Sequence, residues 1–430
     1  MATLLVTSIA LLAGLLMTRV FKYLKLNFPD VTAFLIAGLM VGPYCLGRTG
    51  IDGLGFSTMA DVDGLSVLTN TALGFIAFAI GNEFRLSQLK QTGKQAFVIG
   101  IFQALMAALL VDASMILLHF ILGEEVLPLP ATITLGAIAS ATAPAATLMV
   151  VRQYKAKGPV TDLLLPIVAL DDAVGLIIFA VSIGIAQAME GGTLNVISVI
   201  VNPLLEIVCS LILGALMGLL LTELEKIFFS NSNRLSLSIA FVIMTIALAS
   251  IRIELGSVEI SFSSLLVCMM LGTVFCNMSE FSADIMGRAD KWTAPLFATF
   301  FVVSGAGLEL SVFRYPAIIM IGIVYILIRC AGKFFGASLS SRATHCSETV
   351  QKYLGITLFP QAGVALGMVV SAQCLGEESA SLIRNIILFS VLIYELIGPM
   401  FTKMALTKAG EIVEASADKK SRDRFQQKKA

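Results

Sequence analysis

The sequence predicts an all-α polytopic membrane protein with about thirteen transmembrane helices, and two observations lead to this fold class. Of the 430 residues, 57% are hydrophobic and only 13% are charged, and the mean hydropathy is +0.91. Runs of about 18 or more apolar residues recur along almost the whole chain, and such runs are typical of membrane-spanning helices. This recurrence excludes a soluble domain with a single membrane anchor.

The individual spans follow from allowing about 20 residues for each crossing. They fall at residues 3–21, 31–46, 65–82, 96–121, 130–150, 160–187, 195–222, 235–251, 260–277, 294–308, 315–340, 353–374 and 382–402. We expect one transmembrane domain over 1–407, followed by a short, polar, solvated tail over 408–430.

The distribution of Lys and Arg tests these spans independently, because loops on the cytoplasmic side of a membrane are enriched in both residues. Most of the 29 basic residues fall in loops on one side or in the tail. The other side holds Arg48, Arg252, Arg314 and Arg384. The alternation predicts a multi-pass protein of the cell membrane with its N-terminus outside and its C-terminus in the cytoplasm.

Two adjacent carboxylates, Asp171 and Asp172, interrupt the sixth span, with apolar residues on both sides of them. An ionisable residue inside a span is costly and usually belongs to an ion or proton path. Neighbouring residues on a helix project about 100° apart, so the two aspartates need not have the same role.

Two spans contain a proline near the middle, and the two positions correspond across the halves of the chain. Pro144 follows Ala-Thr-Ala in the fifth span, and Pro360 precedes Gln361, Ala362 and Gly363 in the twelfth. A lone proline often only kinks a helix. Here the two prolines lie seven spans apart, and an odd number of spans reverses the orientation in the membrane. The sequence therefore predicts inverted repeats with two crossed, interrupted helices around a site near the midplane of the membrane.

A weak similarity between Phe75–Glu83 and Phe301–Glu309 supports the repeat. We interpret Glu83 and Glu309, at the ends of their spans, as secondary site candidates or structural caps of the repeat.

Arg329 and Lys333 are the basic residues left inside a predicted span, four positions apart and therefore on one helix face. Arg329 has two interpretations, a secondary site residue or a side chain that extends to the membrane interface. A buried Lys333 needs compensation, and Asp171 and Asp172 are the unpaired acids at comparable depth. We therefore expect a salt bridge between Lys333 and one of the two aspartates.

These features predict exchange of a cation for protons without reference to any relative. Burial disfavours a charged carboxylate, so that a proton and a cation compete for it near neutral pH. A hard monovalent cation prefers oxygen ligands, here a carboxylate and the carbonyls freed at the broken helices. If an aspartate leaves Lys333 during the cycle, two protons exchange per cation, unless the lysine carries the second proton itself.

The residues resemble those of the monovalent cation/proton antiporters. The resemblance covers roughly residues 5–405 and rests on Ala-Leu-Asp-Asp-Ala-Val-Gly, on the two breaks and on Gly-Lys-Phe-Phe-Gly-Ala. The double aspartate is similar to the electrogenic bacterial sodium/proton branch, because the electroneutral relatives usually carry Asn-Asp or Gln-Asp there.

The resemblance implies roles for particular residues. Asp172 is the main ligand of the cation and the proton, Asp171 is its partner paired with Lys333, and Thr142 belongs to the cation path. The family also implies a homodimer in which a core (about 65–187 and 294–402) moves against a scaffold (about 3–46 and 195–277). It implies transported Na⁺, with Li⁺ or K⁺ as alternatives, and H⁺, with no cofactor, no enzymatic activity and no nucleic-acid partner.

Three alternatives remain at this point. An electroneutral K⁺/H⁺ antiporter differs in selectivity and stoichiometry, and a sodium-coupled organic-solute symporter shares the repeat architecture. An intramembrane aspartyl protease also buries two aspartates, but it needs them on separate helices. His119 and His345 fit solvated side chains better than pH sensors, since they lie near a span end and in a loop.

Overall fold

The computed structural model describes residues 2–24, 28–49, 51, 54–82, 86–189, 201–255, 258–308, 310, 313 and 316–412. The helices in these ranges are α1 (Ala2–Tyr23), α2 (Asp30–Val41), α3 (Met59–Asp63), α4 (Ser66–Gly81), α5 (Leu86–Leu122), α6 (Leu129–Ile138), α7 (Pro144–Tyr154), α8 (Pro159–Met189), α9 (Asn202–Glu225), α10 (Asn231–Ala249), α11 (Ser264–Met278), α12 (Ser282–Ala306), α13 (Pro316–Ala343), α14 (Glu348–Thr357), α15 (Gly363–Ser371) and α16 (Glu377–Lys408). Two 3₁₀ helices, η1 (Leu46–Thr49) and η4 (Ala372–Cys374), complete the helical elements.

The protein is a multi-pass membrane protein. Among the described residues, eight helices are long and apolar enough to cross a membrane, and four shorter apolar helices accompany them. The prediction of a helical bundle is therefore confirmed. The predicted spans 31–46 and 96–121 fall within the apolar spans Asp30–Thr49 and Gly93–Leu122. The helices have other bounds than the spans, since α2 ends at Val41 and α5 and α12 begin earlier than 96 and 294.

The loop between α10 and α11 departs from the all-α prediction. Strands β1 (Ile253–Leu255) and β2 (Val258–Ile260) pair antiparallel, with Ile253 opposite Ile260. Strands of three residues produce no clear alternation of apolar and polar residues, so the pattern of the sequence could not reveal them.

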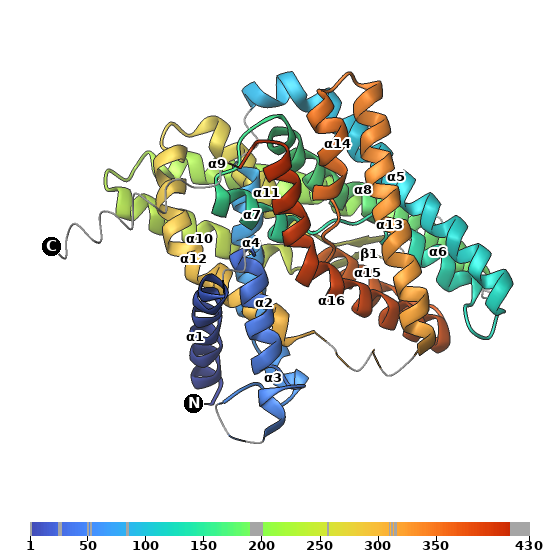
Figure 1. Ribbon diagram of the computed structural model, residues 1–430. Helices are drawn as coiled ribbons and strands as arrows, with labels where there is room; N and C mark the ends of the chain where they lie inside the picture. The colour runs from blue at the N-terminus through green and yellow to red at the C-terminus, as the bar shows by residue number, and fades with distance from the viewer. Residues whose placement is uncertain are drawn as a thin grey trace.

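Two packing groups divide the bundle. One contains α2, α4, α11 and α12, since α2 packs against α12 and α4 against α11, with α9 along α11. In the other, α5 packs against both α13 and α8. In Figure 1, α5, α6 and α13 lie on one side of the molecule, and α1, α10 and α12 lie on the other.

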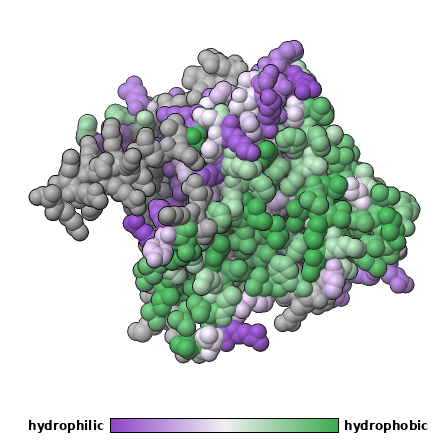
Figure 2. Space-filling model, viewed as in Figure 1, coloured by the Kyte–Doolittle hydropathy of each residue, from purple (hydrophilic) through white to green (hydrophobic). Residues whose placement is uncertain are grey.

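The outer surface carries the apolar side chains expected of a protein surrounded by lipid. Large hydrophobic residues on several helices are more than half exposed, among them Leu109 and Phe120 of α5 and Leu327 of α13. In Figure 2 the apolar residues cover the middle of the face, and polar residues gather toward its upper and lower edges. A soluble protein rarely exposes an apolar surface of this extent.

The turn that follows α16 forms hydrogen bonds with the beginning of α8, the helix that carries the two aspartates. The Glu411 carboxylate accepts hydrogen bonds from the backbone amides of Val160 (2.6 Å) and Thr161 (2.8 Å) and from the Thr161 hydroxyl (2.6 Å). A carboxylate on the first turn of a helix satisfies free amides and interacts favourably with the helix dipole. These hydrogen bonds therefore hold the turn after α16 against the first turn of α8.

Candidate functional site

The chain leaves helical geometry at residues 139–143, between α6 and α7, and again at 358–362, between α14 and α15. The two breaks touch, because the backbone amide of Ala143 donates a hydrogen bond of 2.9 Å to the carbonyl of Pro360. Pro144 occupies the first helical position of α7, where its missing amide costs nothing. Each of the two prolines thus marks a true interruption rather than a kink.

Arg329 joins the two breaks. Its Nε donates to the carbonyl of Ala139 (2.9 Å), its Nη1 to that of Phe359 (2.7 Å) and its Nη2 to that of Ala141 (2.5 Å). The side chain is fully buried, and the guanidinium carbon lies 4.7 Å from the centre of the Tyr394 ring. The interpretation of Arg329 as a side chain that extends to the interface is therefore wrong.

Lys333 lies one turn further along α13 and is also fully buried. Its Nζ is 3.0 Å from Asp171 Oδ2, in an ion pair with both side chains 0% exposed. The same ammonium donates to Thr142 Oγ1 at 2.9 Å and to the carbonyl of Ser140. The expected partnership of Lys333 with an aspartate is thus present, and Asp171 is the aspartate involved.

Asp171 has donors on both of its oxygens. Thr142 Oγ1 donates to Oδ2 at 2.5 Å, and Gln103 Nε2 of α5 donates to Oδ1. The amide of Gln103 also donates to the carbonyl of Gly100 at 2.8 Å. Together with Lys333, these contacts compensate the buried carboxylate, as burial of a charge requires. Gln103 was not among the predicted site residues, although an amide inside an apolar run is a signal that the sequence contains, and its side chain is fully buried.

The carbonyls at the breaks are largely occupied by protein groups. Those of Ala139, Ser140, Ala141 and Phe359 all accept hydrogen bonds from Arg329 or Lys333. We expected the carbonyl groups that the breaks leave without helical hydrogen bonds to be ligands of the transported cation. In this structure two basic side chains neutralise these negative helix ends instead, as positive groups do at the C-terminus of a helix.

Gln361 fills the second break with a polar network. Its Nε2 donates to the carbonyl of Ile138 (2.8 Å), at the end of α6, and lies 3.0 Å from the hydroxyl of Tyr325. Gln361 and Tyr325 are both fully buried. The network is a further link between α13 and the two broken helices.

The remaining predicted site residues differ in how far they can be described. Asp172 follows Asp171 in α8, but its side chain lies outside the described part of the structure. Glu83 and Glu309 lie outside the described residues altogether. Gly363 is the first residue of α15.

A cavity of about 330 Å³ reaches the two breaks. Pro144 of α7 and Pro360 and Gln361 of the second break line one side of it, and residues of α4 and α12 line the other. The cavity therefore lies between the two packing groups, where a substrate could approach the interrupted helices.

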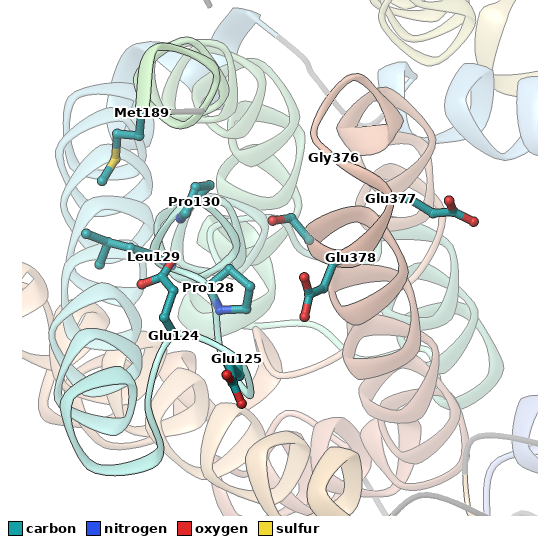
Figure 3. A pocket seen from close by; sticks show the side chains of 10 residues that line it. Glu124, Glu125, Pro128, Leu129, Pro130, Met189, Gly376, Glu377 and Glu378 are labelled. Carbon is teal, nitrogen blue, oxygen red and sulfur yellow. The ribbon is translucent and has the colours of Figure 1, made fainter. Parts of the chain in front are cut away.

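A second, wider pocket of about 630 Å³ lies away from the breaks, where α5 ends and α16 begins. Glutamates line it, and Figure 3 shows Glu124, Glu125 and Glu378 near one another, whereas Glu377 points away from them. His119 belongs to this end of the bundle, with Nε2 3.5 Å from Glu124 Oε2.

Within the described ranges, no group of three or more His, Cys, Asp or Glu side chains could hold a metal ion. His345 lies in the turn after α13 with a φ of +55°.

Comparison with known families decides what this arrangement belongs to. Residues 7–408 match the family described as "Sodium/hydrogen exchanger, transmembrane". The chain belongs to this sodium/hydrogen exchanger family. It is a transmembrane antiporter that exchanges a monovalent cation for protons, and the symporter and protease alternatives are wrong.

Individual relatives of this exchanger are distant. The K⁺/H⁺ antiporter subunit KhtU of Bacillus subtilis is 23% identical over 88% of this chain and 88% of the relative. The high-affinity Na⁺/H⁺ antiporter NhaS3 of Synechocystis is 24% identical over 83% of this chain and 82% of its own length.

A solved structure shares the fold of the exchanger. The sodium proton antiporter MjNhaP1 of Methanocaldococcus jannaschii at pH 8 matches with a TM-score of 0.67 and 17% identity, over 94% of this chain and 97% of the other. The all-helical antiporter fold that the resemblance implies is therefore confirmed at the level of the overall fold.

Proposed function

We propose that this exchanger moves Na⁺ against protons by alternating access, with Asp172 as the carboxylate that the two ions share. One observation carries the assignment: Asp171 already has Lys333, Thr142 and Gln103 as donors. A cation that displaced these donors would leave an ammonium buried without compensation, which is costly. Asp172 is the neighbouring carboxylate on the same helix and remains for the ions.

Asp171, Lys333 and Thr142 form the supporting part of this site. Thr142 contributes to the cation path from the first break, beside the ion pair. If Asp171 separates from Lys333 when the ion binds, the exchanger carries two protons per cation and is electrogenic, as in the two-aspartate bacterial branch. If the pair stays closed, exchange is electroneutral.

The architecture we propose has thirteen crossings, among them the two broken helices α6–α7 and α14–α15 as corresponding members of an inverted repeat. The packing supports a mobile core of α5–α8 and α13–α16. The same packing places α4 and α12 with α2 and α11, and we therefore propose that they belong to the scaffold, whereas the sequence led us to expect them in the core. A homodimer through the scaffold and an N-terminus outside the cell complete the proposal.

Selectivity for K⁺ is the second candidate, because one relative of this exchanger is named a K⁺/H⁺ antiporter subunit. Selectivity depends on small differences in ligand number and cavity size, so the identity of the cation has to be measured.

Transport in reconstituted vesicles tests the proposed function. A pH-sensitive dye inside the vesicles reports proton movement when NaCl, LiCl, KCl or choline chloride is added outside. We expect Na⁺ to move protons and choline to have no effect. Repeating the assay with the membrane potential clamped separates electrogenic from electroneutral exchange. Absence of proton movement with all three metal ions would contradict the proposal.

A further inference from the structure

Glu395 is a carboxylate deep in α16 that the site described above does not use. It lies well inside this helix of 32 residues, and Leu392, Ile393, Leu396 and Ile397 around it are apolar. Such a residue is costly in a membrane and is retained where it serves a purpose.

The carboxylate of Glu395 has no partner among the described residues. Its Oε2 is buried and makes no hydrogen bond, and in the part of the chain that the structure describes no salt bridge involves it. Asp171, in contrast, has donors on both of its oxygens. Because an isolated buried charge is expensive, the Glu395 carboxylate needs a neutralising ion from outside the protein's own side chains.

The charged side chains near Glu395 are engaged elsewhere. On α13, which packs against α16, Arg329 binds the breaks and Lys333 binds Asp171. On α14, Glu348 and Lys352 pair with each other at an exposed position. Of the other helices that pack against α16, α6 and α15 carry no Asp, Glu, Lys or Arg. The charged residue of α2 is Asp30 at its first position, and that of α7 is Arg152 in its last turn.

Glu395 lines the 330 Å³ cavity that reaches the breaks. The other polar side chains of its wall are those of Asp63, Ser66, Thr69, Ser304 and Gln361. No Lys, Arg or His is among the described residues that line it, and Asp63 is exposed. A cavity with acidic groups and no basic ones concentrates cations.

The backbone around Glu395 adds another oxygen. Pro399, inside α16, has no amide, so the carbonyl of Glu395 lacks its usual partner four residues later. One turn along, Gly398 allows α16 to approach the second break closely, because a Cβ at this position would lie 3.0 Å from Pro360 Cγ. The residue therefore lies close to the point where α16 meets the interrupted helix.

We propose that Glu395 is an accessory ion-binding residue, at which a monovalent cation and a proton replace each other on the way between the cavity and Asp172. This inference rests on the proposed function, since the two available neutralising ions are the two substrates of the exchanger. The cation binds the carboxylate together with the carbonyl oxygen of the same residue, and a proton neutralises the carboxylate when the cation leaves. Gln361, at the inner wall of the cavity, lies next along the path.

Chemical labelling of the unmodified protein tests the proposal first. Dicyclohexylcarbodiimide reacts with protonated carboxyl groups in apolar surroundings, and mass spectrometry of the digested protein identifies the labelled residue. We expect labelling of Glu395 that decreases as NaCl, LiCl or KCl is added, with choline chloride giving no protection. Unlabelled Glu395, or labelling that none of the three metal ions reduces, would overturn the proposal.

Transport by the Glu395→Gln variant gives the second test. Removing the charge but keeping the shape should raise the KM for the cation at least roughly fivefold, given the strength of a charge interaction in a partly buried site. Glu395→Asp should recover part of this loss. Asp112→Asn is the matched control, because Asp112 Oδ1 is also buried without a hydrogen bond but does not line the cavity.

The outcomes separate this inference from the proposed function. If the unmodified protein exchanges Na⁺ for protons and Glu395→Gln does so with an unchanged KM, the accessory site is wrong while the exchange stands. If no metal ion drives proton movement in the unmodified protein, the proposed function itself fails. An equal change in KM in Asp112→Asn would show that any lost intramembrane carboxylate has this effect, and would also overturn the proposal.

Discussion

At the scale of single residues, ion binding depends on which carboxylate oxygens already accept hydrogen bonds from the protein. Asp171 accepts hydrogen bonds from Lys333, Thr142 and Gln103, so its charge is compensated within the protein. An ion that bound Asp171 would have to displace these donors, and for this reason the proposal places the ion on the next residue, Asp172. In this proposal the two neighbouring aspartates have different roles on the same turn of α8.

The first prediction concerns Asp172→Asn. The change removes a charge but keeps the volume of the side chain, so we expect a folded protein without cation-dependent proton movement in the vesicle assay. Its melting temperature in detergent should stay close to that of the unmodified protein. Normal exchange in this variant would move the binding residue elsewhere.

The second prediction concerns the buried pair of Lys333 and Asp171. Lys333→Gln or Asp171→Asn alone leaves the other charge without compensation, at a cost of about 3–5 kcal/mol. The double variant should lose less than the sum of the two single variants, which a double-mutant cycle on thermal unfolding in detergent measures.

The exposed pair of Lys352 and Glu348 is the control for this cycle, since its two side chains are 65% and 84% exposed at an N–O distance of 3.0 Å. Its coupling should be no more than about 0.5 kcal/mol. Additive losses for Lys333 and Asp171 would show that the two charges do not compensate each other.

At the scale of the helices, α13 holds the two breaks together. Its Arg329 satisfies carbonyls from both interrupted segments, so α6 and α14 end against the same guanidinium. A buried helix end without such partners is unfavourable, because an unsatisfied buried acceptor costs about 1–3 kcal/mol. Arg329 therefore stabilises both breaks.

The third prediction follows for Arg329→Lys. A lysine keeps the charge but replaces the planar guanidinium with a single nitrogen, which cannot reach three carbonyls in this geometry. We expect a loss of about 1–3 kcal/mol in thermal stability, because at least one acceptor remains unsatisfied. Arg288→Lys is the control, because Arg288 is exposed and pairs with Asp284. Equal stability of the two variants would contradict a bridging role.

At the scale of the whole molecule, the topology determines which side of the membrane each cavity faces. The distribution of basic residues predicts an N-terminus outside, and the end of α16 on the cytoplasmic side beside the start of α8. With this orientation, the glutamate pocket of Figure 3 faces outward.

The fourth prediction is the labelling pattern of single cysteines placed in loops. A membrane-impermeant maleimide added outside intact cells should modify a cysteine at Glu124 or at Glu190, which lies outside the described residues. It should not modify one at Lys155 or Lys291. The native Cys45 and Cys374 are exposed and need to be replaced first. The reverse pattern would invert the proposed topology.

The sequence alone determined the class of this protein, the positions of most spans and the importance of Asp171, Lys333 and the two prolines. These signals are local: an apolar run, a charge inside it or a proline can be interpreted without knowing what lies beside it. The starts of α5 and α12 could not be predicted in the same way, because hydropathy changes gradually where a helix continues beyond the membrane.

Only the tertiary structure decided which polar groups form hydrogen bonds and ion pairs with one another. Arg329 and Ala139 are 190 residues apart in the chain, and Gln103 and Asp171 are 68 apart. No local pattern encodes such contacts. Glu395 is an acid inside an apolar run of the sequence, but that its carboxylate lacks a partner among the described residues became visible only in the packed molecule. These polar contacts are buried, and in a buried site an unpaired polar group is costly. Because burial results from folding, the sequence by itself does not show which polar groups need a partner.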